Sequence, residues 1–144
     1  MRNTRTVAAV AAALMAGPVV AACSSSTGPA LRATIKGKVS VNSQLGSIPD
    51  CPTGSARSVQ DFVPTATLSA TSSSVVSGTV GTDSTYQMSS LTPGQYLMGY
   101  DRFAVFGSDT LVFNATPSIG RLQVNAGEVG TADYSIDGAT CKQH

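Results

Sequence analysis

The sequence predicts an all-β domain, a β-sandwich of about seven strands, and three features of the chain support this prediction. Ser, Thr, Gly and β-branched residues dominate the chain after residue 33, and these residues are poor helix formers. Apolar and polar residues alternate there in short runs, as they do in half-buried strands. Turn residues separate the runs at near-regular intervals, which is typical of a sandwich.

The expected strands follow one another from residue 33 to residue 136. The first begins near Ala33, because Ile35 and Val39 share one parity while polar residues take the other. A long connection, residues 42–63, comes next, and we expect Phe62 within it to dock onto the core. The later strands are expected, in order, at residues 64–71, 74–80, 85–89, 95–101, 110–114, 119–124 and 129–136.

Residues 1–22 are built like an export signal, with a positive start, an apolar run and small residues before Cys23. The string Val20-Ala21-Ala22-Cys23 resembles the lipobox of bacterial lipoproteins. This resemblance implies that the signal is cleaved and that the Cys23 thiol carries lipid. The protein would then be anchored in the bacterial cell envelope, outside the cytoplasm and at the outer membrane if the organism has one.

The alternative to lipidation is an uncleaved membrane-spanning helix. The apolar stretch, residues 7–22, has only 16 residues and contains Pro18, whereas a spanning helix needs about 20 apolar residues. A lipid anchor is therefore the favoured reading, and two or more acyl chains would hold it stably. Residues 23–32 are small, polar and rich in chain breakers, so they are expected to form a flexible tether.

The remaining residues, 33–144, are enough for one domain. The whole chain carries nine Lys and Arg against eight Asp and Glu, with no basic run, so nucleic acid is not an expected partner. With Cys23 assigned to lipid, Cys51 and Cys141 form an even pair, which in an exported domain indicates a disulfide. A metal or redox pair is the alternative, but there is no CxxC spacing and the only histidine is His144.

Two motifs are similar to those of the carboxypeptidase regulatory-like, or transthyretin-like, β-sandwich family. They are Thr82-Asp83-Ser84-Thr85-Tyr86-Gln87-Met88 and Leu91-Thr92-Pro93-Gly94-Gln95-Tyr96-Leu97-Met98, the second interpreted as a hairpin turn with core aromatics. The resemblance covers roughly residues 35–136 and implies an immunoglobulin-like (prealbumin-like) fold. It implies no catalysis, since such domains are usually accessory, scaffolding or binding modules, and fold alone does not give function.

No catalytic, metal or cofactor-binding constellation is expected. His144 is the only histidine for a catalytic triad, and we interpret the aspartates, including Asp83 and Asp137, as turn residues. Three tyrosines, Tyr86, Tyr96 and Tyr100, share parity with core methionines. We therefore expect core tyrosines with hydroxyls at the rim, rather than a sugar-stacking surface.

The segment Asp101–Phe106 is either an exposed loop or one more strand. As a loop it would let Phe103 and Phe106 form a small apolar contact patch, and these two residues are the candidate ligand-binding positions. The sequence thus favours a non-catalytic accessory or binding module with an envelope protein or glycan as partner. The alternatives are a purely structural envelope component, a carbohydrate-binding module and, least favoured, a small hydrolase using the region from Asp101 to Asp109.

Overall fold

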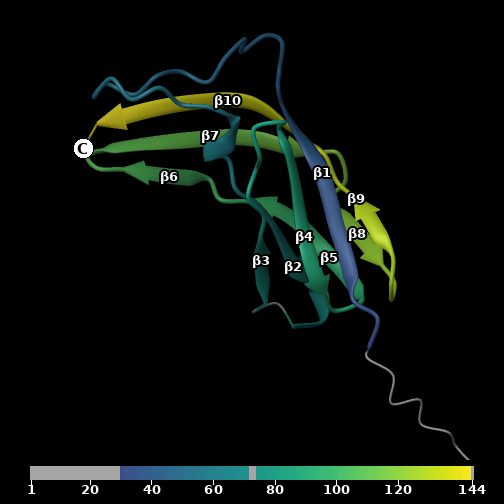
Figure 1. Ribbon diagram of the computed structural model, residues 1–144. Helices are drawn as coiled ribbons and strands as arrows, with labels where there is room; N and C mark the ends of the chain where they lie inside the picture. Colours follow the sequence, from purple (N-terminus) through teal and green to yellow (C-terminus); the bar gives the residue numbers. More distant parts are fainter. Residues whose placement is uncertain (1–29, 72–73, 144) are drawn as a thin grey trace, which may run out of the picture.

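The computed structural model describes residues 30–71 and 74–143 and shows two β-sheets around one core (Figure 1). The expected signal peptide (1–22), Cys23 as the expected lipidation site, the expected tether up to residue 29, and His144 lie outside the described residues. The larger sheet contains β1 (Ala33–Val41), β4 (Thr85–Leu91), β6 (Phe103–Phe106), β7 (Asp109–Pro117), β9 (Val129–Thr131) and β10 (Tyr134–Gln143). The smaller sheet contains β2 (Pro64–Leu68), β3 (Val75–Ser77), β5 (Gly94–Tyr100) and β8 (Arg121–Val124).

The strand order is β4-β1-β10-β7-β6 in the larger sheet, with β9 also paired to β1, and β3-β2-β5-β8 in the smaller one. The only helical elements in the described residues are two short 3₁₀ turns, Val59–Asp61 and Ser69–Thr71. The all-β prediction is confirmed. The described residues form ten strands, more than the seven or so expected of the sandwich. Compared with the eight ranges expected from the sequence, residues 103–106 add one strand and the run 129–136 divides into two.

The division between β9 and β10 occurs at Ala132 and Asp133, where the pairing with β1 is interrupted although both strands keep the same parallel register along β1. The Ala132 carbonyl accepts a hydrogen bond from the buried hydroxyl of Tyr86. On β1, Gly37 leaves room for this carbonyl, since a Cβ added there would lie 1.9 Å from the Ala132 oxygen. Next to the break, the Asp133 carboxylate accepts the backbone N–H of Lys38 at 2.8 Å. These contacts hold the chain beside β1 across the break, so that β9 and β10 follow one another along the same strand.

The core lies between the sheets, and tyrosine hydroxyls bridge them. Tyr134, on β10 of the larger sheet, donates to the Gly99 carbonyl of β5 at 2.6 Å. In the opposite direction, the Tyr100 hydroxyl of β5 accepts the backbone N–H of Ala115 on β7 at 3.0 Å. Burial raises the pKa of Tyr134. The expected core position is confirmed for Tyr86 and Tyr96, whereas Tyr100 is partly buried. Tyr134 is buried as well. The hydroxyls of Tyr86, Tyr96 and Tyr134 donate to backbone carbonyls, so they satisfy backbone acceptors inside the fold.

Phe62 is fully buried at the centre of this core, as expected from the sequence. Its ring packs against Tyr100, Phe113 and Tyr134 with centroid separations of 5.3 to 5.4 Å. The end of the 42–63 segment is therefore fixed in the core, and Ile48 and Cys51 earlier in the segment are also buried.

The turn Thr92-Pro93-Gly94 does not form the expected hairpin. It joins β4 of the larger sheet to β5 of the smaller one, so the chain crosses the core at this point. Leu91 and Tyr96 on either side of the turn are both buried, and each faces the space between the sheets from its own side. Inward-facing residues on both sides of a turn are compatible with a crossing between sheets as well as with a hairpin. The motif alone therefore does not distinguish the two arrangements, and the hairpin prediction was wrong.

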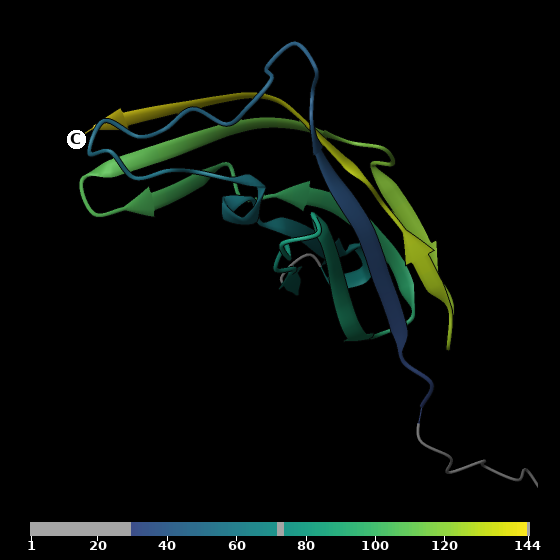
Figure 2. The same ribbon diagram turned by 45° about the horizontal axis from the view of Figure 1, so that its top comes forward.

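One end of the larger sheet projects beyond the smaller sheet (Figures 1 and 2). We call this part the arm: β6 with residues 109–112 of β7 and 140–143 of β10, which pair in register.

Near the base of the arm, β10 has a bulge at Asp137. Its carboxylate accepts the Thr116 hydroxyl at 2.7 Å and the Asn42 amide at 3.2 Å, and these bonds, the first above all, lower the pKa of Asp137.

A substitution at Gly37 tests the break between β9 and β10. We expect Gly37→Ala to lower the free energy of unfolding by about 3 kcal/mol, because the new methyl group overlaps the Ala132 carbonyl. Gly120→Ala is the matched control, since a Cβ there meets nothing within 4 Å. Urea unfolding followed by circular dichroism measures both; equal stability of the two variants would contradict the described geometry.

Alkaline pH should weaken the fold through the buried tyrosines. Burial raises the pKa of Tyr86 and Tyr134 above the ordinary value of about 10. Their contribution to stability is therefore complete below pH 10 and is lost as the pH rises from there through the folded-state pKa. We expect the urea midpoint to fall between pH 9 and pH 11, and to fall less in Tyr134→Phe; a midpoint independent of pH over this range would refute it.

Candidate functional site

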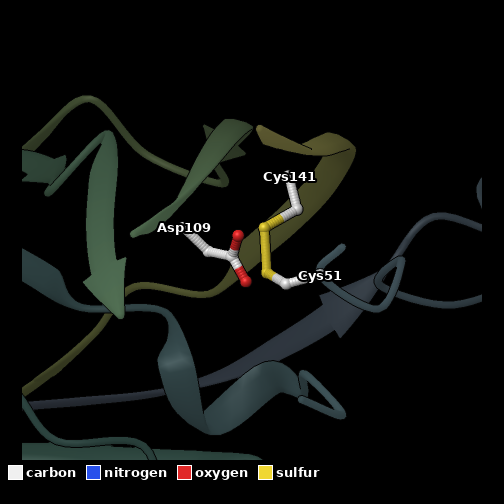
Figure 3. A group of neighbouring side chains, drawn as sticks. All are labelled: Cys51, Asp109 and Cys141. Atoms are coloured by element: carbon white, nitrogen blue, oxygen red, sulfur yellow. A yellow bond between two sulfur atoms is a disulfide. The ribbon is translucent and has the colours of Figure 1, made fainter. Parts of the chain in front are cut away.

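The arm carries a disulfide that attaches the long connection, residues 42–63, to its inner face. Cys51 in the connection is bonded to Cys141 on β10, with the two Cα atoms 5.2 Å apart (Figure 3). The disulfide expected from the cysteine count is thus confirmed. Because both sulfurs are used in this bond, neither is a thiolate, and a thiolate is the form in which cysteine binds metal or attacks a substrate.

Asp109 lies beside the disulfide and is completely buried. One carboxylate oxygen, Oδ2, accepts hydrogen bonds from the backbone N–H of Thr53, at 3.3 Å, and from its hydroxyl. The other, Oδ1, has no hydrogen-bond partner among the described residues. One carboxylate oxygen and the two sulfurs lie within 4.8 Å of one another. A buried carboxylate is stable only when partnered, so Thr53 ties the connection to the arm a second time.

Sequence reasoning missed Asp109 by interpreting it as a turn aspartate. A signal was present, because Asp109 shares strand parity with Leu111 and Phe113, which are both buried. Alternation in a strand places such a residue on the core side. An aspartate at that position predicts a buried carboxylate with a dedicated partner.

Arg57 makes a third attachment between the connection and the arm. Its guanidinium carbon lies 3.4 Å from the centroid of the Phe106 ring, a cation–π arrangement. Its Nε donates to the Cys51 sulfur at 3.4 Å. The inner face of the arm is therefore covered by the connection through one covalent bond, one buried carboxylate and one stacked cation.

Phe103 and Phe106, the two candidate contact residues, lie on opposite faces of β6. The segment is a strand and not a loop, and three positions along a strand reverse the side-chain direction. Phe106 is half-buried on the inner face under Arg57, whereas Phe103 is 59% exposed on the outer face. The exposed apolar pair on the outer face consists of Phe103 and Val105, the latter 70% exposed.

Asp101 and Asp109 are not brought together, although the sequence placed them in one region. Asp101 precedes β6 and is exposed, and its backbone N–H donates to the Val63 carbonyl at 2.9 Å. Asp109 follows the turn at the far end of β6 and is sealed behind the disulfide. The length of a strand therefore separates the two carboxylates, which is too far for them to act on one substrate atom.

Three of the cavities on the described surface have volumes of about 180, 270 and 260 Å³. Small-molecule sites are usually larger, about 300 to 1,000 Å³. Of these three cavities, one has an acidic residue in its lining, Asp133. The Asp133 carboxylate already accepts a hydrogen bond from the backbone N–H of Lys38. The surface feature that stands out is therefore the exposed edge of β6.

Comparisons with protein-family models, with curated proteins and with solved structures find no match to this chain. Within residues 30–71 and 74–143, no helix has the length and apolar character needed to cross a membrane.

Loss of the disulfide should weaken the whole domain. We expect the double variant Cys51→Ala, Cys141→Ala to unfold with a free energy about 3 kcal/mol lower, since the bond links positions 90 apart in the sequence. The measurement is urea unfolding of the full chain in detergent, with and without a dithiol reductant. The reductant should lower the free energy of unfolding of the parent and leave that of the double variant unchanged. A parent whose stability does not change with the reductant would show that the disulfide does not stabilise the domain.

Proposed function

We propose that this chain is a lipid-anchored protein of the bacterial cell envelope whose β-domain binds another protein without catalysing a reaction. The anchor is supported by the lipobox-like string ending at Cys23. The domain is then held outside the cytoplasm, at the outer membrane where the organism has one. A second acyl chain makes such attachment stable, because each buried CH₂ contributes about 0.8 kcal/mol.

We further propose that the fold is a variant of the transthyretin-like, immunoglobulin-like sandwich. Two sheets around one core support this proposal. The family-like turn before β4 is built around Asp83, whose carboxylate accepts the hydroxyl and the backbone N–H of Thr85 at 2.8 and 3.1 Å. These bonds, the first above all, lower the pKa of Asp83. The arm is the element that such a seven-stranded sandwich would not contain.

The observation that carries the binding function is the uncovered edge of β6. It is the last strand of the larger sheet, and its outer face shows Phe103 and Val105 to solvent. An exposed apolar edge strand offers unpaired backbone groups to another chain, and proteins that do not use such an edge usually block it with charge or proline. Residues 103–106 contain neither. A protein partner is favoured over a glycan because Tyr86, Tyr96 and Tyr134 are buried and cannot stack on sugars.

Membrane attachment is tested at Cys23. We expect Cys23→Ala to leave the membrane fraction when cells are broken, because the variant has no thiol to acylate, and globomycin to cause accumulation of the unprocessed precursor. Cys51→Ala with Cys141→Ala is the control that removes cysteines without removing the anchor. Retention of Cys23→Ala in membranes would contradict lipid anchoring.

Protein binding is tested by placing a photo-reactive benzoylphenylalanine at Phe103 in the full chain and irradiating intact cells. We expect a discrete protein adduct from this position and none from the same residue placed at Val129, which is also exposed, at 52%. Absence of any adduct at position 103 in membrane-bound protein would overturn the binding function.

A further inference from the structure

We propose that β6 pairs with β6 of a second copy of the chain, forming an antiparallel, two-fold symmetric dimer. This inference rests on the proposed function and names the partner of the same edge. Figures 1 and 2 show β6 along the free border of the arm, with no other described strand on its outer side.

The backbone groups of β6 that remain unpaired belong to Phe103 and Val105. The Arg102 carbonyl accepts the backbone N–H of Phe113 on β7 at 2.9 Å, so position 102 faces β7. In an antiparallel ladder the direction alternates from one residue to the next. Positions 104 and 106 therefore also face β7, and the N–H and C=O groups of Phe103 and Val105 point to the open edge.

Phe103 and Val105 also carry the exposed side chains of β6. Because the open backbone groups and the exposed side chains belong to the same residues, one pairing register between two copies is favoured. A second strand must place its own open groups opposite those of the first, and its exposed face on the same side. Both conditions are met when Ala104 of each copy lies on the two-fold axis. Phe103 of one copy then faces Val105 of the other, twice by symmetry, and the two pairs exchange four N–H···O bonds. Aromatic and β-branched residues opposite one another are favourable cross-strand pairs.

Such self-complementarity is what an isologous contact requires, because the same patch must serve both partners. Ala104 is small, so the strands can approach at the axis. Charge does not oppose the approach: the chain has a formal net charge of +1, and no charged residue lies within positions 103–106. Arg57 stacks on Phe106 on the inner face of the strand, and the preceding residue, Arg102, has its guanidinium carbon 5.9 Å from the centroid of the neighbouring Phe103 ring.

The area of contact sets where the dimer should form. Stable interfaces bury about 1,200 Å² or more, and two four-residue strands supply less than this. Pairing is therefore weak between freely diffusing copies. Anchoring both copies on one membrane raises their effective concentration, which strengthens a weak contact without new interactions. We accordingly expect the dimer in the envelope and not in dilute detergent solution.

The test is disulfide cross-linking of the full, membrane-anchored chain. Residues facing each other at the centre of the proposed register form a non-hydrogen-bonded pair, with Cα atoms about 4.5 Å apart, which suits a disulfide. We expect Ala104→Cys, oxidised with copper–phenanthroline in intact cells, to give a product of twice the monomer mass. Val129→Cys, exposed on another strand, is the control and should give at least tenfold less.

A second variant tests the register itself. Val105→Pro removes an N–H that points to the open edge and spares the bonds to β7, and proline is tolerated at such edge positions. Combined with Ala104→Cys, it should reduce the cross-linked product at least tenfold while the Cys51–Cys141 bond and membrane attachment remain. Yield from Ala104→Cys no higher than from Val129→Cys overturns self-pairing.

The outcome at Phe103 then separates the two proposals. A photo-adduct of twice the monomer mass supports the second copy as partner. An adduct of another mass shows that β6 binds a different protein, so that self-pairing fails and the proposed function stands. Absence of an adduct at position 103 contradicts both the protein-binding function and self-pairing.

Discussion

The attachment of the 42–63 connection to the arm is the constraint on which the rest of the structure depends. The arm extends beyond the smaller sheet (Figure 1), so one of its faces would otherwise lack a covering layer. The Cys51–Cys141 bond, the Thr53–Asp109 hydrogen bonds and the Arg57–Phe106 stack hold the connection against that face. The connection ends at Phe62, which is fixed in the main core. Arm and core are thereby joined into one unit.

This arrangement leaves the two faces of β6 with different roles. Ala104 and Phe106 pack inward and hold the strand in place, while Phe103 and Val105 remain outside. A strand supported on one face and through β7 presents its free edge in a defined geometry, which lowers the entropy lost when a partner strand is added. The Cys51–Cys141 disulfide therefore supports the proposed binding indirectly, because it helps to hold the arm and its edge strand in place.

Much of the fold could be predicted from local patterns, because strands that separate a core from solvent alternate in polarity. This holds for β1, β4 and β5, and the cysteine count gave the disulfide. β6 could not be assigned, since Phe103–Phe106 is apolar on both faces and carries no alternation. The break at Ala132 depends on Gly37 and Tyr86, which are distant in sequence. Strand parity could have identified Asp109 as a buried residue, but its partner Thr53 lies 56 positions away in the sequence, and no local pattern links the two.

Residue-resolved amide hydrogen exchange tests the central claim, that β6 is an open edge filled by its own copy, most directly. The full chain would be compared in dilute detergent and at high density on membranes. The account requires fast exchange at Phe103 and Val105 in dilute detergent beside protected Ala104 and Phe106, and at least tenfold slower exchange of the first two amides on membranes. Protection of Phe103 and Val105 in the dilute monomer, or unchanged fast exchange on the membrane, would contradict it.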